Sequence, residues 1–245
     1  MNISLAPETI FTMGSLPVTN TLFTTWIVVA FLAGLAYALR RATMVPGKLQ
    51  NFFELVCEQG LGLAAGIIGS EQTAKKFFSL AMTVFLFIFT ANMFKMLPGV
   101  NSIGLMHSGG EAGKELIPFL RAPASDLNFT LALALISVFF IQIAGVSFLG
   151  LKRYASKFFT LRSPLYFFVG MLDIISECAK IISFSFRLFG NIFAGEVLMV
   201  VVFSFFAFLV PLPFMILEVF VGFIQAFVFA MLTVVFIKIA VSGNH

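Results

Sequence analysis

The chain has 245 residues, of which 60% are hydrophobic and only 11% are charged, and 34 are phenylalanine. A soluble domain carries about a quarter charged residues, so this chain could not cover a core with polar surface. The composition excludes a soluble globular protein and predicts an all-α integral membrane protein. Its net charge of +4 is no argument for nucleic acid, because Lys and Arg in membrane proteins first report topology.

The first two thirds of the chain hold three apolar stretches that are long enough to cross a bilayer as helices of about 20 residues. They are residues 21–39, 77–97 and 128–149. Residues 1–20 lack a basic n-region and a small-residue cleavage site, so we expect an outer N-terminal segment and not a cleaved signal peptide. The whole of 1–245 is expected to form one membrane domain.

Residues 48–69 show a different pattern. Leu49, Phe52, Phe53 and Val56 recur at helical spacing, with polar residues between them. This pattern predicts a helix that lies in the membrane interface and does not cross it.

The last third contains no loop signal from Pro164 to Val210, and Pro211 and Pro213 then break the chain. One helix of this length would extend about 70 Å, although the hydrocarbon core is only about 30 Å thick. Either a turn lies near Gly190 and Gly195, or the helix is strongly tilted. No turn-forming cluster supports the turn, so we predict a tilted hairpin over residues 164–241, with its second helix from about Phe214. Such a hairpin makes sense if it lies along another protein.

Basic residues distinguish the connecting segments. Residues 40–76 hold five basic and three acidic side chains, residues 149–162 hold four basic and none acidic, and residues 95–126 hold three of each. Positive segments stay on the cytoplasm-like side. The N-terminus is then outside, and the hairpin enters from the inside and returns there.

Ionisable and amide side chains recur inside the apolar hairpin, where a charge costs several kcal/mol. At 100° per residue, one stripe within about 80° contains Asp173, Glu177, Lys180, Arg187 and Asn191. Glu196 lies about 180° from Arg187. On the second helix, Glu218 and Gln225 share a face.

Structural interpretations of these groups compete with a functional one. The carboxylates could be neutral and hydrogen-bonded, Lys180 could extend to the basic side, and Arg187 could pair with Glu177 or Glu196. Six ionisable groups on two adjacent helices nevertheless favour an ion path. Groups on opposite faces suggest two access routes. A permanent cation between the routes suits arginine, because a desolvated lysine can lose its proton.

The remaining candidate residues carry no chemistry in this interpretation. Cys57 and Cys178 match no metal-ligand spacing, and we expect both to be small buried residues. His107 and His245 are expected in a solvent-facing loop and at the terminus. The sequence has no phosphate-binding loop, so we expect no cofactor, no metal and no bond-making chemistry in this chain.

The hairpin contains the two motifs "SFRLFGNIFAGE" (185–196) and "IQAFVFAMLTVVF" (224–236). Both resemble signatures of one family, subunit a of F-type ATP synthases. Four further stretches resemble other signatures of this family: "PVTNTLFTTW" (17–26), "VPGKLQNFFE" (45–54), "NMFKMLPG" (92–99) and "SDLNFTLALAL" (125–135).

The resemblance implies a stator subunit beside a rotating c-ring, together with peripheral-stalk b subunits. It implies that Arg187 faces the ring carboxylates, with Asn191 and Gln225 close to it. Glu196 matches a carboxylate of an outer half-channel, and Glu218 stands where some members carry histidine. Asp173 matches an inner position, and Glu177 and Lys180 share its stripe. Asp126 and Asn128 are candidates for the outer entrance.

Two other classes of protein fit the same charges. A self-contained secondary transporter or channel would use them too, although such proteins often show an internal repeat and none is visible here. A structural scaffold would tolerate replacement of Arg187. The resemblance implies that the ring mainly chooses the coupled ion, so the choice between H⁺ and Na⁺ stays open, with H⁺ the better candidate. They fit a bacterial plasma membrane and a mitochondrial inner membrane equally.

Overall fold

The computed structural model describes residues 7–13, 16–40, 47–96, 104–108, 114–158, 164–205 and 210–242. Most of this part is helical. The helices are α1 (Asn20–Leu39), α2 (Lys48–Ile68), α3 (Glu71–Phe94), η2 (Pro123–Ser125), α4 (Leu127–Leu149), α5 (Leu151–Phe158), α6 (Pro164–Phe205) and α7 (Pro211–Ser242). The strands are β1 (Thr9–Met13), β2 (Leu16–Thr19), β3 (Gly104–Ser108) and β4 (Lys114–Pro118).

Five helices of the described part are long and apolar enough to cross a membrane: α1, α3, α4, α6 from Phe167 onward, and α7. The prediction of an all-α integral membrane protein is therefore confirmed. The helix α2 is not among the five. At 1.5 Å per residue, the 42 residues of α6 and the 32 residues of α7 extend about 63 Å and 48 Å. Each must be tilted to stay within a bilayer of about 30 Å.

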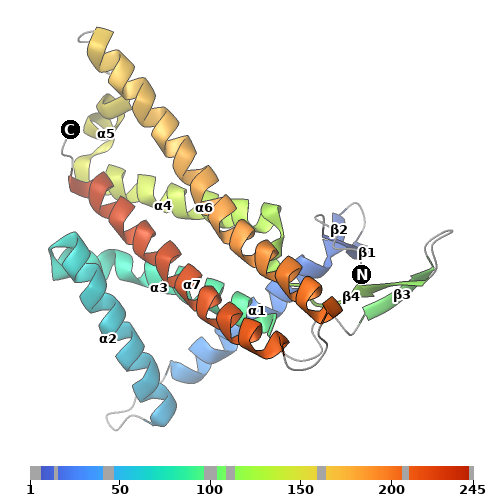
Figure 1. The fold of residues 1–245 in the computed structure, drawn as a ribbon. Helices are drawn as coiled ribbons and strands as arrows, with labels where there is room; N and C mark the ends of the chain where they lie inside the picture. Colours follow the sequence, from blue (N-terminus) through green and yellow to red (C-terminus); the bar gives the residue numbers. More distant parts are fainter. Residues whose placement is uncertain are drawn as a thin grey trace.

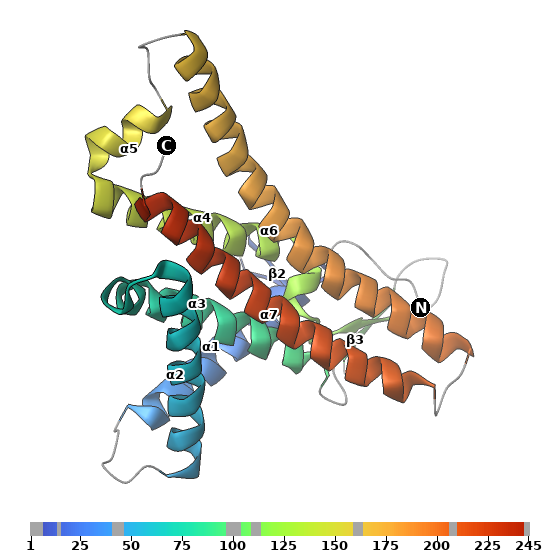
Figure 2. The same cartoon turned by 60° about the vertical axis from the view of Figure 1, so that its left-hand side comes forward.

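The helices α6 and α7 form a hairpin whose two arms converge at one end and diverge at the other (Figures 1 and 2). We call these the turn end and the open end. The hairpin lies across α3 and α4, and the short helix α5 lies near the open end. The β3–β4 hairpin lies toward the turn end.

Polar caps and glycines set the helix boundaries. The Ser70 side chain accepts a hydrogen bond from the backbone N–H of Thr73 and so caps the N-terminus of α3. The helix therefore begins at Glu71, earlier than the expected start at residue 77. Thr19 caps α1 in the same way. Gly69 ends α2 with φ 83° and Gly150 ends α4 with φ 77°, a left-handed φ that glycine adopts without strain.

The second arm of the hairpin begins earlier than the sequence suggested. Pro211 and Pro213 were expected to form a turn before a helix at Phe214, but α7 starts at Pro211. Proline fits the first turn of a helix because the N–H groups of that turn have no partner within the helix. The expectation that these prolines stand outside the helix was therefore wrong.

Three smaller expectations also need correction. Cys178 is exposed and Cys57 is half-buried, because both lie on helix faces that this chain leaves partly uncovered. His107 lies on strand β3, since the segment expected to be a loop pairs with β4. Residues 151–158, expected as a basic loop, form α5. His245, Leu97 and residues 1–6 lie outside the described residues.

The core lies where the hairpin packs on α3 and α4. The Phe184 and Phe229 rings stack with centroids 4.6 Å apart, and Leu188 is fully buried. Ala134, Ala144, Ala226 and Ala230 are also buried, and small residues of this kind let membrane helices approach closely. This packing fixes the rotation of both arms about their axes and so places the polar residues between them.

Candidate functional site

The polar side chains along the hairpin fall into three groups. The turn-end group consists of Lys95, Arg121, Glu196 and Glu218. The central group consists of Ser183, Arg187, Asn191 and Gln225. The open-end group consists of Gln142, Tyr154, Glu177 and Lys180. In the described part of the chain, no three His, Cys, Asp or Glu side chains gather as a metal ion would require.

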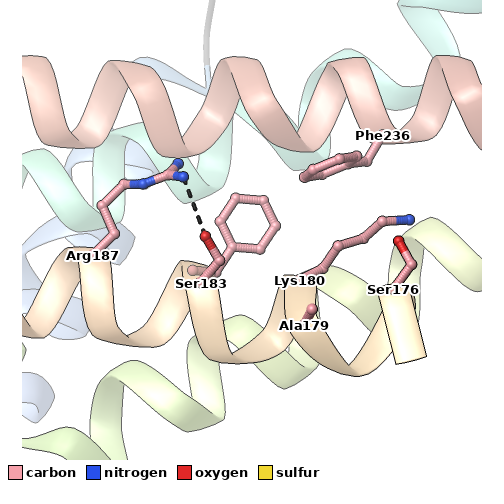
Figure 3. A pocket seen from close by; sticks show the side chains of 7 residues that line it. Ser176, Ala179, Lys180, Ser183, Arg187 and Phe236 are labelled. Carbon is pink, nitrogen blue, oxygen red and sulfur yellow. Dashed lines mark hydrogen bonds between the residues drawn. The ribbon is translucent and has the colours of Figure 1, made fainter. Parts of the chain in front are cut away.

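Arg187 is the cation of the central group. Its guanidinium lies between α6 and α7 (Figure 3), and Nη2 donates to Ser183 Oγ at 3.3 Å. Nη1 is buried and has no hydrogen-bond partner among the described residues, and within the same residues Arg187 has no ion pair. Since a guanidinium cannot discharge, this leaves a permanent cation with unused donors.

A cavity of about 260 Å³ opens beside Arg187. Figure 3 shows Lys180 extending below the Phe236 ring on the far side of this cavity from Arg187. The Lys180 ammonium lies 4.8 Å from the Phe236 ring centre, a cation–π distance. The other lining residues are Ser176, Ala179, Ser183 and Phe184. Two basic side chains therefore border one cavity, which suits an anionic group.

A side-chain hydrogen bond joins the two arms one turn beyond Arg187. Asn191 Nδ2 donates to Gln225 Oε1 at 2.7 Å. Gln225 is only 3% exposed, and its Nε2 has no partner in the described part of the chain. The pair fixes the spacing of α6 and α7 beside the arginine.

Two buried ion pairs form the turn-end group. Lys95 Nζ lies 3.0 Å from Glu218 Oε1, and the two side chains are 8% and 11% exposed. Arg121 Nη2 lies 3.7 Å from Glu196 Oε2. Lys95 directly follows α3, and Arg121 precedes η2, so both cations come from outside the hairpin.

Gly195 makes room for the first of these pairs. A Cβ at this position would collide with Glu218 Oε1 and would lie 3.5 Å from Lys95 Nζ. The glycine next to Glu196 thus lets the Glu218 carboxylate approach the α6 backbone. Through this contact the two ion pairs form one cluster.

The open-end group holds the Glu177 carboxylate from two sides. Lys180 Nζ donates to Glu177 Oε1 at 2.7 Å, and Gln142 Nε2 of α4 donates to Glu177 Oε2 at 2.7 Å. Tyr154 of α5 donates to Gln142 Oε1. Asp173, one turn earlier on α6, is half-buried and has no ion pair within the described residues.

These contacts decide between the structural interpretations of the charges. Arg187 forms no structural ion pair with Glu177 or Glu196, because Lys180 and Arg121 pair with those carboxylates. Lys180 does not extend away from the bundle, since it folds back onto Glu177. The Arg187 guanidinium is therefore left without an ion pair among the described residues.

Asp126 and Asn128 stand at the start of α4. Asp126 is buried, and its Oδ1 accepts from the Asn128 backbone N at 2.9 Å as a helix cap. Its Oδ2 accepts from Thr21 Oγ1 at 3.0 Å, which ties α4 to α1. The Asn128 side chain is exposed.

The sequence reasoning missed Lys95, Arg121, Gln142 and Tyr154. A lysine directly after an apolar helix and an arginine a few residues before one are weak signals for buried charge, because most residues there face the membrane surface. Gln142 offered a stronger signal, since it is a lone amide within the apolar span of α4.

A hairpin of two long apolar helices with paired buried charges defines a multi-pass membrane protein with a charged intramembrane site. A family profile described as ATP synthase A chain matches residues 22–238. The chain is 34% identical over 239 residues to the ATP synthase subunit a of Moorella thermoacetica, covering 97% of this chain and 98% of the relative. It is 36% identical over 215 residues to the ATP synthase subunit a of Helicobacter pylori strain Shi470, covering 87% and 85%. The chain therefore belongs to the ATP synthase A chain family, and the resemblance seen in the sequence is confirmed.

Proposed function

We propose that this chain is the stator subunit that carries protons across the membrane past the c-ring of an ATP synthase. The observation that carries the proposal is Arg187: it alone among the charges of the cavity lacks a carboxylate within the described residues. A passing ring carboxylate supplies the missing partner. The chain itself makes and breaks no covalent bond.

Two offset half-channels meet beside Arg187. The turn-end group forms the outer one, with Glu218 and Glu196 passing protons and Asp126 and Asn128 at its entrance. The inner one runs from Asp173 past Glu177 and Lys180. Asn191 and Gln225 hold the two arms together between the channels.

Arg187 separates the channels by charge. An incoming proton neutralises a ring carboxylate that had faced the guanidinium, and a neutral site rotates into lipid at much lower cost than an ion. The same site later loses its proton to the inner channel. The transmembrane potential contributes about 2.3 kcal/mol per charge per 100 mV.

The surroundings follow from the same proposal. The N-terminus lies outside and the C-terminus lies on the cytoplasm or matrix side of a bacterial plasma membrane or a mitochondrial inner membrane. Peripheral-stalk b subunits and the c-ring are the partners, and H⁺ is the translocated ion.

Replacement of Arg187 tests the proposal. Arg187→Ala should abolish ATP-driven proton pumping and ATP synthesis in membrane vesicles, while the chain still co-purifies with the c-ring. Arg187→Lys should fail nearly as badly, because a desolvated lysine can lose its proton.

Arg40→Ala serves as the matched control, since Arg40 is exposed at the end of α1 and its loss should leave pumping unchanged. Near-normal coupled activity in Arg187→Ala would overturn the proposal. Purification of the chain without any ring of small subunits would favour a self-contained transporter instead.

A further inference from the structure

The short helix α5 buries one aromatic side chain. Tyr154 is 6% exposed, whereas Lys152, Arg153, Ala155 and Ser156 around it are exposed. Its ring packs against Gly145 of α4, where a Cβ would collide with the ring. The glycine therefore provides the space in which α5 docks on α4.

The orientation of Gln142 follows from the groups on either side of it. An ionised carboxylate only accepts hydrogen bonds, so Gln142 must present Nε2 to Glu177, at 2.7 Å. Gln142 Oε1 then faces Tyr154, whose hydroxyl donates to it. Desolvation and the nearby Glu177 charge raise the pKa of Tyr154 to about 12, which keeps this donor protonated.

The chain of contacts continues to the cavity beside Arg187. Glu177 Oε2 accepts a hydrogen bond from Gln142 of α4, and Oε1 accepts one from Lys180 of α6. Each carboxylate oxygen is therefore held by a side chain of a different helix. Lys180 lines the cavity that Arg187 also lines. A link of three hydrogen bonds thus runs from α5 across α4 to the cavity.

We propose that Tyr154 is a positioning residue that, through Gln142, fixes the Glu177–Lys180 pair at the cavity beside Arg187. The inference rests on the proposed function insofar as this pair belongs to the inner half-channel. The amphipathic helix α5 then sets the geometry of the proton path, although none of its described side chains lines the cavity.

Proton pumping in vesicles tests the link through a double-mutant cycle. Tyr154→Phe removes the hydroxyl and keeps the ring against Gly145. We expect the pumping rate to fall by about three- to tenfold, the range for one lost hydrogen bond. In a Glu177→Gln background, Tyr154→Phe should cause no further fall. Gln142→Leu breaks the same link and should reproduce the effect.

Tyr37→Phe is the matched control, because Tyr37 is 64% exposed and lies on α1, which contributes no residue to the open-end group. An equal fall in both backgrounds would show that Tyr154 acts only through folding, and would overturn the proposal. An unchanged rate in Tyr154→Phe would also overturn it, provided Glu177→Gln itself slows pumping.

A second measurement separates this inference from the proposed function. Ser176 lines the same cavity, and Ser176→Cys can be probed with silver ion after Cys57→Ser and Cys178→Ser remove the native thiols. Tyr154→Phe should raise the labelling rate about three- to tenfold. Without the hydrogen bond from Tyr154, the Glu177–Lys180 pair is held less firmly, and Lys180 should then restrict access to the cavity less. Faster labelling with normal pumping in Glu177→Gln would support the positioning and reject Glu177 as a channel residue. An unchanged labelling rate would reject the positioning.

Discussion

The two ends of the hairpin hold their carboxylates in different ways. At the turn end, Glu218 pairs with Lys95, which is 123 residues away in the chain, and Glu196 pairs with Arg121. At the open end, Glu177 pairs with Lys180, three residues later on the same helix. The open-end pair can form as soon as α6 forms, whereas the turn-end pairs exist only after α3, α6 and α7 have packed.

This difference separates two kinds of dependence. Removing a charge at the turn end should affect assembly and transport together, because it leaves a buried charge uncompensated between helices. Removing a contact at the open end should affect transport first, because both charges of the Glu177–Lys180 pair lie on the same helix. The changes at Lys95 and Gly195 below test the expectation for the turn end, and the Tyr154 and Gln142 variants above test the expectation for the open end.

The largest expected effect is at Lys95. Lys95→Met leaves Glu218 buried without its counter-charge, and breaking a buried pair costs about 3–5 kcal/mol. We expect that little of the variant chain co-purifies with the complex and that proton pumping is lost. Lys75→Met is the matched control: Lys75 pairs with Glu71, both side chains are at least 60% exposed, and such a pair contributes about 0–1 kcal/mol.

A double variant sharpens this first prediction. Lys95→Met with Glu218→Leu removes both charges, so the amount of assembled chain should recover while pumping stays low. If Lys95→Met alone assembles and pumps normally, the turn end does not depend on its ion pair and the contrast between the two ends is wrong.

Particular residues show what the sequence could and could not predict. The length of the apolar stretches predicted the membrane-spanning helices. The absence of a turn-forming cluster around Gly190 predicted that α6 is one continuous helix. The spacing of Glu177 and Lys180 placed both on one stripe. The partner of Glu218 could not be predicted, because no local rule relates residues 95 and 218. Pairing between α3 and α7 arises only from packing of the whole bundle.

An intermediate effect is expected at Gly195. In Gly195→Ala the new Cβ displaces the Glu218 carboxylate and stretches its bond to Lys95, and overpacking of this kind costs about 1–3 kcal/mol. Stability should fall in an SDS titration of the protein in mild detergent, and pumping should fall with it.

Gly34→Ala is the control for that change. No atom lies within 4 Å of a Cβ at Gly34, and alanine in a helix interior is favoured over glycine by about 0.5–1 kcal/mol. It should therefore stabilise α1 slightly. Equal behaviour of the two variants would mean that Glu218 does not rely on the space at Gly195.

The smallest expected effect is at Asp126, which distinguishes a carboxylate that holds helices together from those proposed to pass protons. Both of its oxygens accept hydrogen bonds within the chain, from Thr21 and from Asn128 N. Asparagine also caps helices well, whereas alanine loses about 1 kcal/mol at a cap. Asp126→Asn should thus keep nearly full pumping, and Asp126→Ala should lose about 1 kcal/mol of stability with a modest loss of pumping. The measurements are pumping rate and the SDS titration midpoint. A loss of pumping in Asp126→Asn as deep as that in Glu218→Gln, at unchanged stability, would show that Asp126 passes protons itself and does not only stand at the entrance of the proposed outer half-channel.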